Sequence, residues 1–187
     1  MELPKYITNN IKLSPQKEAE LYSYFEKLKF KKGEFLYEQG SVCRSIFFIK
    51  EGLARAFYYS DSGKEITGWF ALENEFITAF DSFYYKTVTN INCELLEDTI
   101  LYALSTADLE LLLEKDHDFA KIAFNILSQI TMNIVEFMGT LKFQTAKERY
   151  LFLTEKHPQI PQRVTLQHIA SYLGITRETL SRLRAEL

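Results

Sequence analysis

The sequence has few of the residues that cross-link a protein chain or break its helices and strands. Its 187 residues contain two cysteines, four prolines, seven glycines and one tryptophan. The two cysteines, Cys43 and Cys93, are too few for a disulfide framework, and an iron–sulfur cluster needs about four thiolates. We therefore expect both thiols to be small packed side chains, with a redox role as the minor alternative.

Long hydrophobic runs are also missing. The longest purely apolar runs are short, such as Ile46–Ile49, whereas a membrane-spanning helix needs roughly 20 apolar residues. The start of the chain has no basic segment followed by an apolar run, so we expect no secretory signal, no membrane segment and a cytoplasmic protein. The composition, 47% apolar and 25% charged, is typical of a globular protein of one or two domains.

Histidine is scarce, and this argues against an enzyme. The three histidines, His117, His157 and His168, fall in or at the ends of predicted helices. Metal-dependent β-barrel enzymes need two or three histidines and a carboxylate inside the barrel. The sequence also has no nucleophile elbow and no glycine-rich phosphate loop. We predict no catalysis, no metal and no cofactor.

The first half of the chain has the spacing of short strands. Ser14 and Pro15 are a helix start signal, and we expect a short helix over about residues 15–28. Over about residues 30–105, short runs of β-branched and aromatic residues alternate with glycine-containing turns every 8–12 residues. This spacing predicts a β-sandwich or barrel.

Helices return after the barrel, and Thr106 is the expected cap of the first. The next helix carries an apolar stripe in steps of three or four residues: Phe119, Ile122, Ile126, Ile130, Asn133, Phe137 and Leu141. The stripe would be over about 30 Å long at 1.5 Å per residue, and a second copy of the chain is the simplest partner for it. The alternative is that the stripe lies along its own barrel.

The C-terminal part of the chain differs in charge from the rest. From Lys142 to Leu187, eight Lys/Arg face four Glu, which gives +4 and leaves −7 for the remaining 141 residues. This basic segment predicts an anionic partner for the tail alone. Thr145 and Glu148 form a capping box that begins a helix over 146–156, and residues 141–144 before it are a hinge candidate.

The last 20 residues have the pattern of two helices joined by a tight turn. Ala170 is small where the second helix would cross the first, and Gly174 tolerates the positive φ of the turn. Aliphatic residues recur at the spacing of an inward face: Ile169, Leu173, Ile175, Leu180 and Leu183, with Leu187 at the end. Together these positions predict a helix-turn-helix.

The outer face of the last helix has residues suited to reading DNA bases. Thr176 is its expected N-cap, and the 100° step turns the following residues outward: Arg177, Glu178, Ser181, Arg182 and Ala185. Arginine pairs with guanine and glutamate accepts from cytosine. Thr165 and Gln167, at the start of the preceding helix, could reach a phosphate, although Thr165 could equally be a plain N-cap. The alternative is a solvated charged face.

Barrel, long apolar helix and C-terminal helix-turn-helix, in this order, resemble the cyclic-AMP receptor / fumarate-nitrate regulator family of bacterial transcription factors. The resemblance implies an α+β fold: a cyclic-nucleotide-binding-type β-barrel (a jelly roll) with flanking helices over 1–112, a dimerisation helix over 113–141 and a DNA-binding domain over 142–187. Within "GITRETLSR" it implies base contacts by Arg177, Glu178 and Arg182, and backbone contacts by Thr176 and Thr179. It also implies a homodimer on a palindrome of double-stranded DNA, and makes RNA polymerase a candidate partner.

The sequence departs from this family in the barrel. Cyclic-nucleotide-binding members carry a Gly-Glu pair and an Arg-Ser/Thr pair, but Ala79 stands at the expected glutamate and Thr89-Asn90 at the expected arginine-serine. Because a buried cyclic phosphate needs a cation, we predict no cyclic-AMP binding. Aromatic and polar residues could instead line a pocket for an unknown effector, if one exists: Phe76, Phe80, Phe83, Tyr84, Thr89 and Asn90. Core packing is the alternative interpretation of the aromatics.

The predicted function is therefore a homodimeric transcription regulator that reads a palindromic operator with the helix over 176–187 and does not respond to cyclic AMP. Family members continue into a small β wing, and the sequence stops at Leu187, so we expect that the wing is absent, whether naturally or by truncation. The rival interpretation is a ligand-sensing or protein-interaction module whose terminal helices pack instead of binding DNA.

Overall fold

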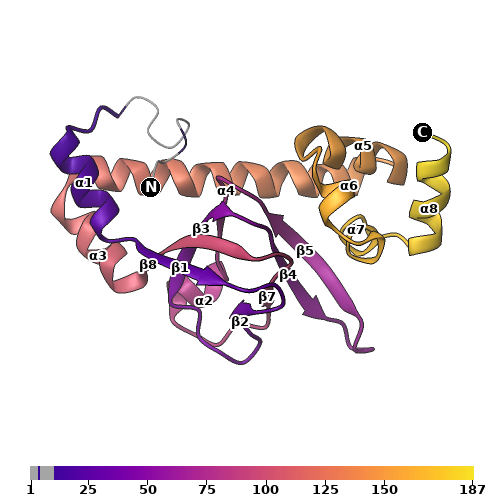
Figure 1. Ribbon diagram of the computed structural model, residues 1–187, viewed down its shortest axis with the longest axis horizontal. Coiled ribbons are helices and arrows are strands. Elements are labelled where there is room, and N and C mark those ends of the chain that lie inside the picture. Colours follow the sequence, from indigo (N-terminus) through magenta and orange to yellow (C-terminus); the bar gives the residue numbers. More distant parts are fainter. Residues whose placement is uncertain (1–3, 5–10) are drawn as a thin grey trace. The chain divides into compact units, whose positions relative to one another are not determined.

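The computed structural model describes residues 4 and 11–187, which form two compact units (Figure 1). The barrel unit comprises the chain up to Ala56 together with Phe70–Ile130, and the helical unit comprises Phe57–Trp69 and Thr131–Leu187. In the described part of the chain, no helix is long and apolar enough to cross a membrane.

The barrel unit begins with helix α1, Pro15–Ser23, which is shorter than predicted. The Ser14 hydroxyl accepts the Lys17 N–H and Pro15 occupies the first turn, as expected. The expected continuation to residue 28 is wrong, because Glu26–Phe30 forms strand β1. This strand pairs antiparallel with β8, Thr99–Ser105, so sheet pairing overrides the helical spacing that Leu28 completes.

The strands form two four-stranded sheets, which confirms the predicted barrel of the jelly-roll type (Figure 1). The first sheet has the order β1-β8-β3-β6 and the second β2-β7-β4-β5. The remaining strands are β2 Phe35–Tyr37, β3 Ser45–Glu51, β4 Ala54–Tyr59, β5 Glu65–Ala71, β6 Phe76–Ile77 and β7 Asn92–Leu95. The short helix α2, Phe80–Tyr85, lies between β6 and β7.

One core cluster joins the helices of the barrel unit to its first sheet. It consists of side chains from α1, β3, β6, β8, α3 (Thr106–Lys115) and α4 (His117–Phe143): Leu21, Phe48, Phe76, Leu104, Leu112, Phe119 and Ile122. The cap of α3 is Ser105, whose hydroxyl accepts the Asp108 N–H, rather than the expected Thr106. The start of α4 is thus fixed by its own apolar side chains against the barrel.

Both cysteines are free and buried, as the sequence predicted. Burial raises the pKa of the Cys93 thiol well above its usual value. The Cys43 thiol lies 3.3 Å from the Ser45 carbonyl oxygen and donates to it. A protonated, enclosed thiol such as that of Cys93 is a poor nucleophile, and both cysteines are packed as buried side chains.

A buried ion pair crosses the second sheet, and nothing in the sequence pattern indicated it. Arg55 of β4 is almost fully buried, and its Nη1 donates to Glu94 Oε1 of the neighbouring strand β7 at 2.5 Å. A guanidinium out of water must keep an anionic partner, since desolvation otherwise costs several kcal/mol. The pair therefore fixes which face of β4 and β7 points inward.

The helical unit contains α5 Ala146–Lys156, α6 Ile160–Arg163, α7 Leu166–Tyr172 and α8 Arg177–Ala185. The predicted capping box is confirmed: the Thr145 hydroxyl accepts the Glu148 N–H, and the Glu148 carboxylate accepts the Thr145 N–H. His157 caps the end of α5. Burial, with a smaller contribution from Lys156, lowers the pKa of His157 from 6.5 to about 4.

We expect Glu94→Ala to lower the free energy of unfolding in urea by roughly 3 kcal/mol, because it removes the carboxylate that pairs with the buried Arg55 guanidinium. The double variant Arg55→Met/Glu94→Leu should recover most of this loss. Asp98→Ala is the matched control, since its pair with Lys31 is exposed and should change stability by less than about 1 kcal/mol. Equal effects of Glu94→Ala and Asp98→Ala would contradict the role of the buried pair.

The lowered pKa of His157 predicts a pH dependence of stability. Unfolded histidine binds a proton near pH 6.5, whereas folded His157 does so only near pH 4. The contribution of neutral His157 to the free energy of unfolding is therefore fully present above about pH 6.5 and is lost progressively as the pH drops toward 4. Thermal unfolding should show this slope flattened in His157→Gln and retained in His117→Gln, an exposed histidine. An identical slope in His157→Gln would exclude His157 as its source.

Candidate nucleic-acid interface

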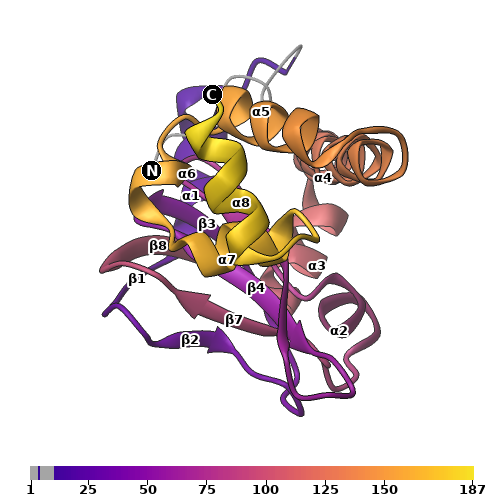
Figure 2. The ribbon, with the colours of Figure 1, turned by 90° about the vertical axis from the view of Figure 1, so that its right-hand side faces the viewer.

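Helices α7 and α8 are joined by a tight turn and cross each other closely (Figure 2). Gly174 has φ +67°, a conformation that a residue with a Cβ rarely adopts. The Ile175 N–H then donates to the Ala170 carbonyl at 3.0 Å. Ala170 is itself buried, so its small side chain sits where the two helices approach, as the sequence predicted.

The inward face of this helix pair matches the prediction, apart from its last residue. Ile169, Leu173, Leu180 and Leu183 are buried, and Ile175 is partly buried. Leu187 was expected to face inward, but its side chain is 57% exposed. The reason is that α8 ends at Ala185, so the helical period no longer sets the direction of Leu187.

Threonine side chains cap both helices of the pair. The Thr165 hydroxyl accepts the His168 N–H at 3.3 Å, and the Thr176 hydroxyl accepts the Thr179 N–H at 3.1 Å. The Thr176 and Thr179 hydroxyl oxygens are also 3.0 Å apart. The N-cap interpretation of Thr165 and Thr176 is thus confirmed, and the phosphate contacts of Thr165, Gln167, Thr176 and Thr179 stay predictions.

One face of α8 presents four exposed side chains of the kind that read base edges. These are Arg177, Glu178, Ser181 and Arg182, which the sequence placed on the outward face. Hydrogen bonds to Glu178 from its own backbone N–H, and then from Thr176, lower its pKa, and the charges of Arg177 and Arg182 act in the same direction. The carboxylate is therefore an acceptor at neutral pH.

Two cations of the basic C-terminal segment have internal roles. Arg149 Nε donates to the Leu173 carbonyl at 3.1 Å, and its Nη1 donates to the Gln144 carbonyl at 2.8 Å. Lys156 Nζ lies 2.8 Å from Glu136 Oε2. The exposed cations that remain for an anionic partner include Lys142, Lys147, Arg177, Arg182 and Arg184.

The predicted dimer stripe on α4 faces its own chain. Phe119 and Ile122 are buried in the barrel-unit core, and Ile126 and Ile130 pack against it. Within the helical unit, Phe137 stacks on Tyr172 with ring centroids 4.5 Å apart. Of the stripe residues only Leu141 is exposed in the single chain. This burial favours the alternative interpretation, and a dimer contact of Phe119, Ile122, Ile126, Ile130, Asn133, Phe137 and Leu141 stays a prediction.

A second stripe lies beside the first on α4 and shares Leu141 with it. Its members are exposed and alternate in steps of three and four: Phe124, Leu127, Thr131, Ile134, Met138 and Leu141. This is the a/d pattern of a coiled-coil seam. Sequence reasoning missed it, because both faces of the helix are apolar and periodicity alone does not say which face meets the barrel.

The residues expected to line an effector pocket differ in their exposure. Phe76 and Phe83 are buried, whereas Phe80 and Tyr84 stack on each other at the surface. Thr89 is buried, and its hydroxyl accepts the Ile91 N–H. Asn90 is exposed. The aromatics thus divide between core packing and surface, because the short helix α2 has one buried side, and the effector role of these residues stays a prediction.

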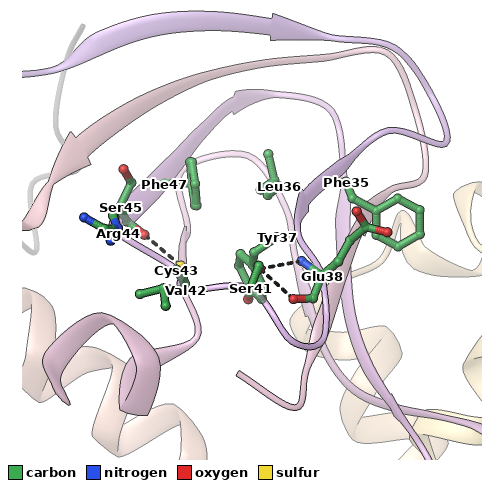
Figure 3. A pocket seen from close by; sticks show the side chains of 10 residues that line it. All are labelled: Phe35, Leu36, Tyr37, Glu38, Ser41, Val42, Cys43, Arg44, Ser45 and Phe47. Carbon is green, nitrogen blue, oxygen red and sulfur yellow. Dashed lines mark hydrogen bonds between the residues drawn. The ribbon is translucent and has the colours of Figure 1, made fainter. Parts of the chain in front are cut away.

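A hollow of about 380 Å³ lies elsewhere, along β2 and the turn into β3 (Figure 3). Its lining falls within residues 35–47 and includes Tyr37, Cys43 and Phe47. None of the six predicted effector residues lines it. Near α2, the exposed cation Lys86 pairs with Glu110 at 2.9 Å.

Comparison with known proteins agrees with this architecture. Residues 27–116 match the cyclic nucleotide-binding domain family. The transcriptional activator protein anr of Pseudomonas aeruginosa is 26% identical over 166 residues, 82% of this chain. FnrA of Stutzerimonas stutzeri matches at the same identity and coverage. The chain spans 66% of the length of each of these relatives, just under two thirds.

Solved structures show the same fold. FixK2 from Bradyrhizobium japonicum superimposes with a TM-score of 0.73 at 20% identity, covering 87% of this chain and 84% of FixK2. The c-di-GMP-responsive regulator CLP of Xanthomonas campestris gives 0.71 at 16% identity, covering 92% and 91%. Residues 27–116 thus form a cyclic nucleotide-binding-type domain, and the chain as a whole is similar to regulators of the cyclic-AMP receptor / fumarate-nitrate regulator (CRP/FNR) type.

Proposed function

We propose that the protein is a transcription regulator that binds a palindromic DNA operator as a homodimer. The observation that carries this proposal is the exposed face of α8, where Arg177, Glu178, Ser181 and Arg182 stand on a helix fixed by a tight turn. Guanidinium groups pair with guanine, and a carboxylate accepts from cytosine. The names of the relatives, transcriptional activators among them, support the same function.

The side chains of α8 would contact DNA bases, while the N-terminal ends of α7 and α8 would bind the DNA backbone. The N-termini of α7 and α8 offer free N–H groups and hydroxyls to phosphates, with Thr165, Gln167, Thr176 and Thr179 at these ends. Glu178 would lower affinity for DNA in general, because it faces phosphates. An ionised carboxylate on this face is thus useful where one sequence must be distinguished from another.

The dimer would form through the second stripe of α4. Its side chains are exposed in the single chain and follow the a/d spacing: Phe124, Leu127, Thr131, Ile134, Met138 and Leu141. Two parallel copies would bury it by knobs-into-holes packing. The two α8 helices would then enter successive major grooves about 34 Å apart, which requires a palindromic site.

The barrel supports a regulator that does not bind cyclic AMP. Ala79 stands where the family has a ribose-binding glutamate, and Thr89-Asn90 where it has the phosphate-binding arginine. The buried Arg55 already has Glu94 as partner, and Lys86 pairs with Glu110. Neither of these two cations is therefore available as the counter-charge of a cyclic phosphate. We further propose a cytoplasmic location and contact with RNA polymerase, as for a transcription regulator.

The rival proposal, a ligand-sensing or protein-interaction module, is favoured by the hollow beside β2, which an unidentified effector could occupy. The two proposals differ in salt dependence. A DNA complex loses affinity with a slope near one per phosphate contact as salt rises. A protein contact need not do so.

Selection of bound sites from a random duplex pool should yield a palindrome. On that duplex, Arg177→Ala and Arg182→Ala should each weaken binding by about 1–3 kcal/mol and relax the preference at one base pair. Arg184→Ala is the control, because Arg184 is not among the residues predicted to contact bases. It should weaken binding to all duplexes by the same factor. Unchanged discrimination among operator variants in both Arg177→Ala and Arg182→Ala would refute base reading by α8.

Ile134→Glu should convert the dimer to monomer in sedimentation analysis, because it places a charge at the centre of the proposed seam. Met132→Glu is the matched control: Met132 is also an exposed apolar residue of the same helix, but lies outside the a/d positions. The control should stay dimeric. If Ile134→Glu remained dimeric, or if only Met132→Glu became monomeric, the dimer contact would lie outside the proposed seam.

A further inference from the structure

The hairpin residues of the helical unit, Phe57–Trp69, contact the first helix of the DNA-reading pair. Ser171 of α7 makes both contacts with its hydroxyl. The Thr67 N–H donates to Ser171 Oγ at 2.9 Å, and Ser171 Oγ donates to the Glu65 carbonyl at 3.1 Å. One side chain thus satisfies two backbone groups of the same strand.

This strand segment is suited to such a contact. β5 is the outermost strand of the second sheet, so one row of its backbone N–H and C=O groups lacks a neighbouring strand. The C=O of residue i and the N–H of residue i+2 point to the same side of a strand. A serine hydroxyl, which can donate and accept at once, bridges Glu65 and Thr67 in this geometry.

An aromatic stack stands beside the serine. Trp69 lies edge-on to Phe137 at 5.9 Å between centroids, and Phe137 stacks on Tyr172, the neighbour of Ser171. The three rings come from the hairpin, from α4 and from α7. Aromatic pairs of this kind contribute about 0.5–1.5 kcal/mol each beyond the area they bury.

These contacts leave the DNA-facing residues free. Thr165 and Gln167 of α7 are exposed, as are Arg177 and Arg182 of α8, while Thr67 is buried. The contact therefore restrains the reading helices without covering the surface that the proposed function requires. A restrained binding surface loses less conformational entropy when it binds.

We propose that Ser171 and Tyr172 are positioning residues, which latch the α7–α8 pair to the hairpin residues 57–69 and so preorganise it for DNA. This latch rests on the proposed function, but it can be observed without DNA. Trp69 is the only tryptophan of the chain, so its fluorescence reports on the aromatic stack alone.

Three variants test the latch. Ser171→Ala removes the bridging hydroxyl, Ser171→Thr keeps a hydroxyl, and Thr154→Ala is the matched control, because the Thr154 hydroxyl donates within its own helix to the Leu151 carbonyl. We expect Ser171→Ala to red-shift Trp69 emission and to increase its quenching by acrylamide. It should also weaken binding to the selected palindrome by about three- to tenfold, because only part of the free energy of the two lost hydrogen bonds bears on binding.

The pattern across duplexes separates positioning from reading. Ser171→Ala should weaken binding to the palindrome and to its base-pair variants by the same factor, since the side chains that contact bases are intact. Arg182→Ala should instead reduce the differences in affinity among these duplexes. Ser171→Thr and Thr154→Ala should match the wild type in emission and affinity. Tyr172→Leu should shift Trp69 emission independently of Ser171.

The outcomes are distinguishable. If the wild-type protein binds no duplex at low salt, the proposed function fails, and the latch fails as a device for DNA binding. If the wild type binds but Ser171→Ala leaves either Trp69 emission or affinity unchanged, the latch alone is overturned. A loss of affinity in Ser171→Ala that is accompanied by altered base preference would also overturn it, because Ser171 would then act through the reading residues.

Discussion

Helix α4 carries two adjacent stripes of apolar side chains, and the rest of the structure depends on what each stripe packs against. Side chains of the first stripe pack within the chain: Phe119 and Ile122 enter the barrel-unit core, and Phe137 enters the stack with Trp69 and Tyr172. The second stripe of this 27-residue helix is exposed in the single chain and needs another partner. The exposed face through Phe124 and Ile134 is therefore the surface that a second chain would bury.

The sequence predicted local features well where a single residue type meets a single geometric requirement. Gly174 at positive φ, the capping box of Thr145 and Glu148, and the cap at Thr176 follow from rules that involve only neighbouring residues, and the structure contains all of them. The order of barrel, long helix and helix pair was also predictable, because the hydrophobic period changes at each boundary.

Prediction failed where the outcome depends on contacts between distant residues. The helical spacing that ends at Leu28 gave way to pairing with β8, and the burial of Phe119 and Ile122 of α4 in the barrel-unit core was not predicted from the period of their stripe. The pair of Arg55 and Glu94 is separated by 39 positions, and no local pattern marks it. For the candidate site, the sequence identified the exposed residues of α8 but not Ser171, since a serine near a helix end is ordinary until its partners in β5 are known.

The contacts of the helical unit position the base-reading helix α8 without engaging the side chains that would contact DNA. Arg149 is basic, yet it donates to the carbonyls of Leu173 and Gln144 and so ties α5 to the end of α7. Ser171 ties the same helix to the hairpin residues. Every one of these bonds ends on a backbone group, whose position does not change with side-chain rotamer. The exposed guanidinium groups of Arg177 and Arg182 consequently project from a frame fixed at several points, and a change in that frame would alter the affinity for all DNA sequences before it altered the preference among them.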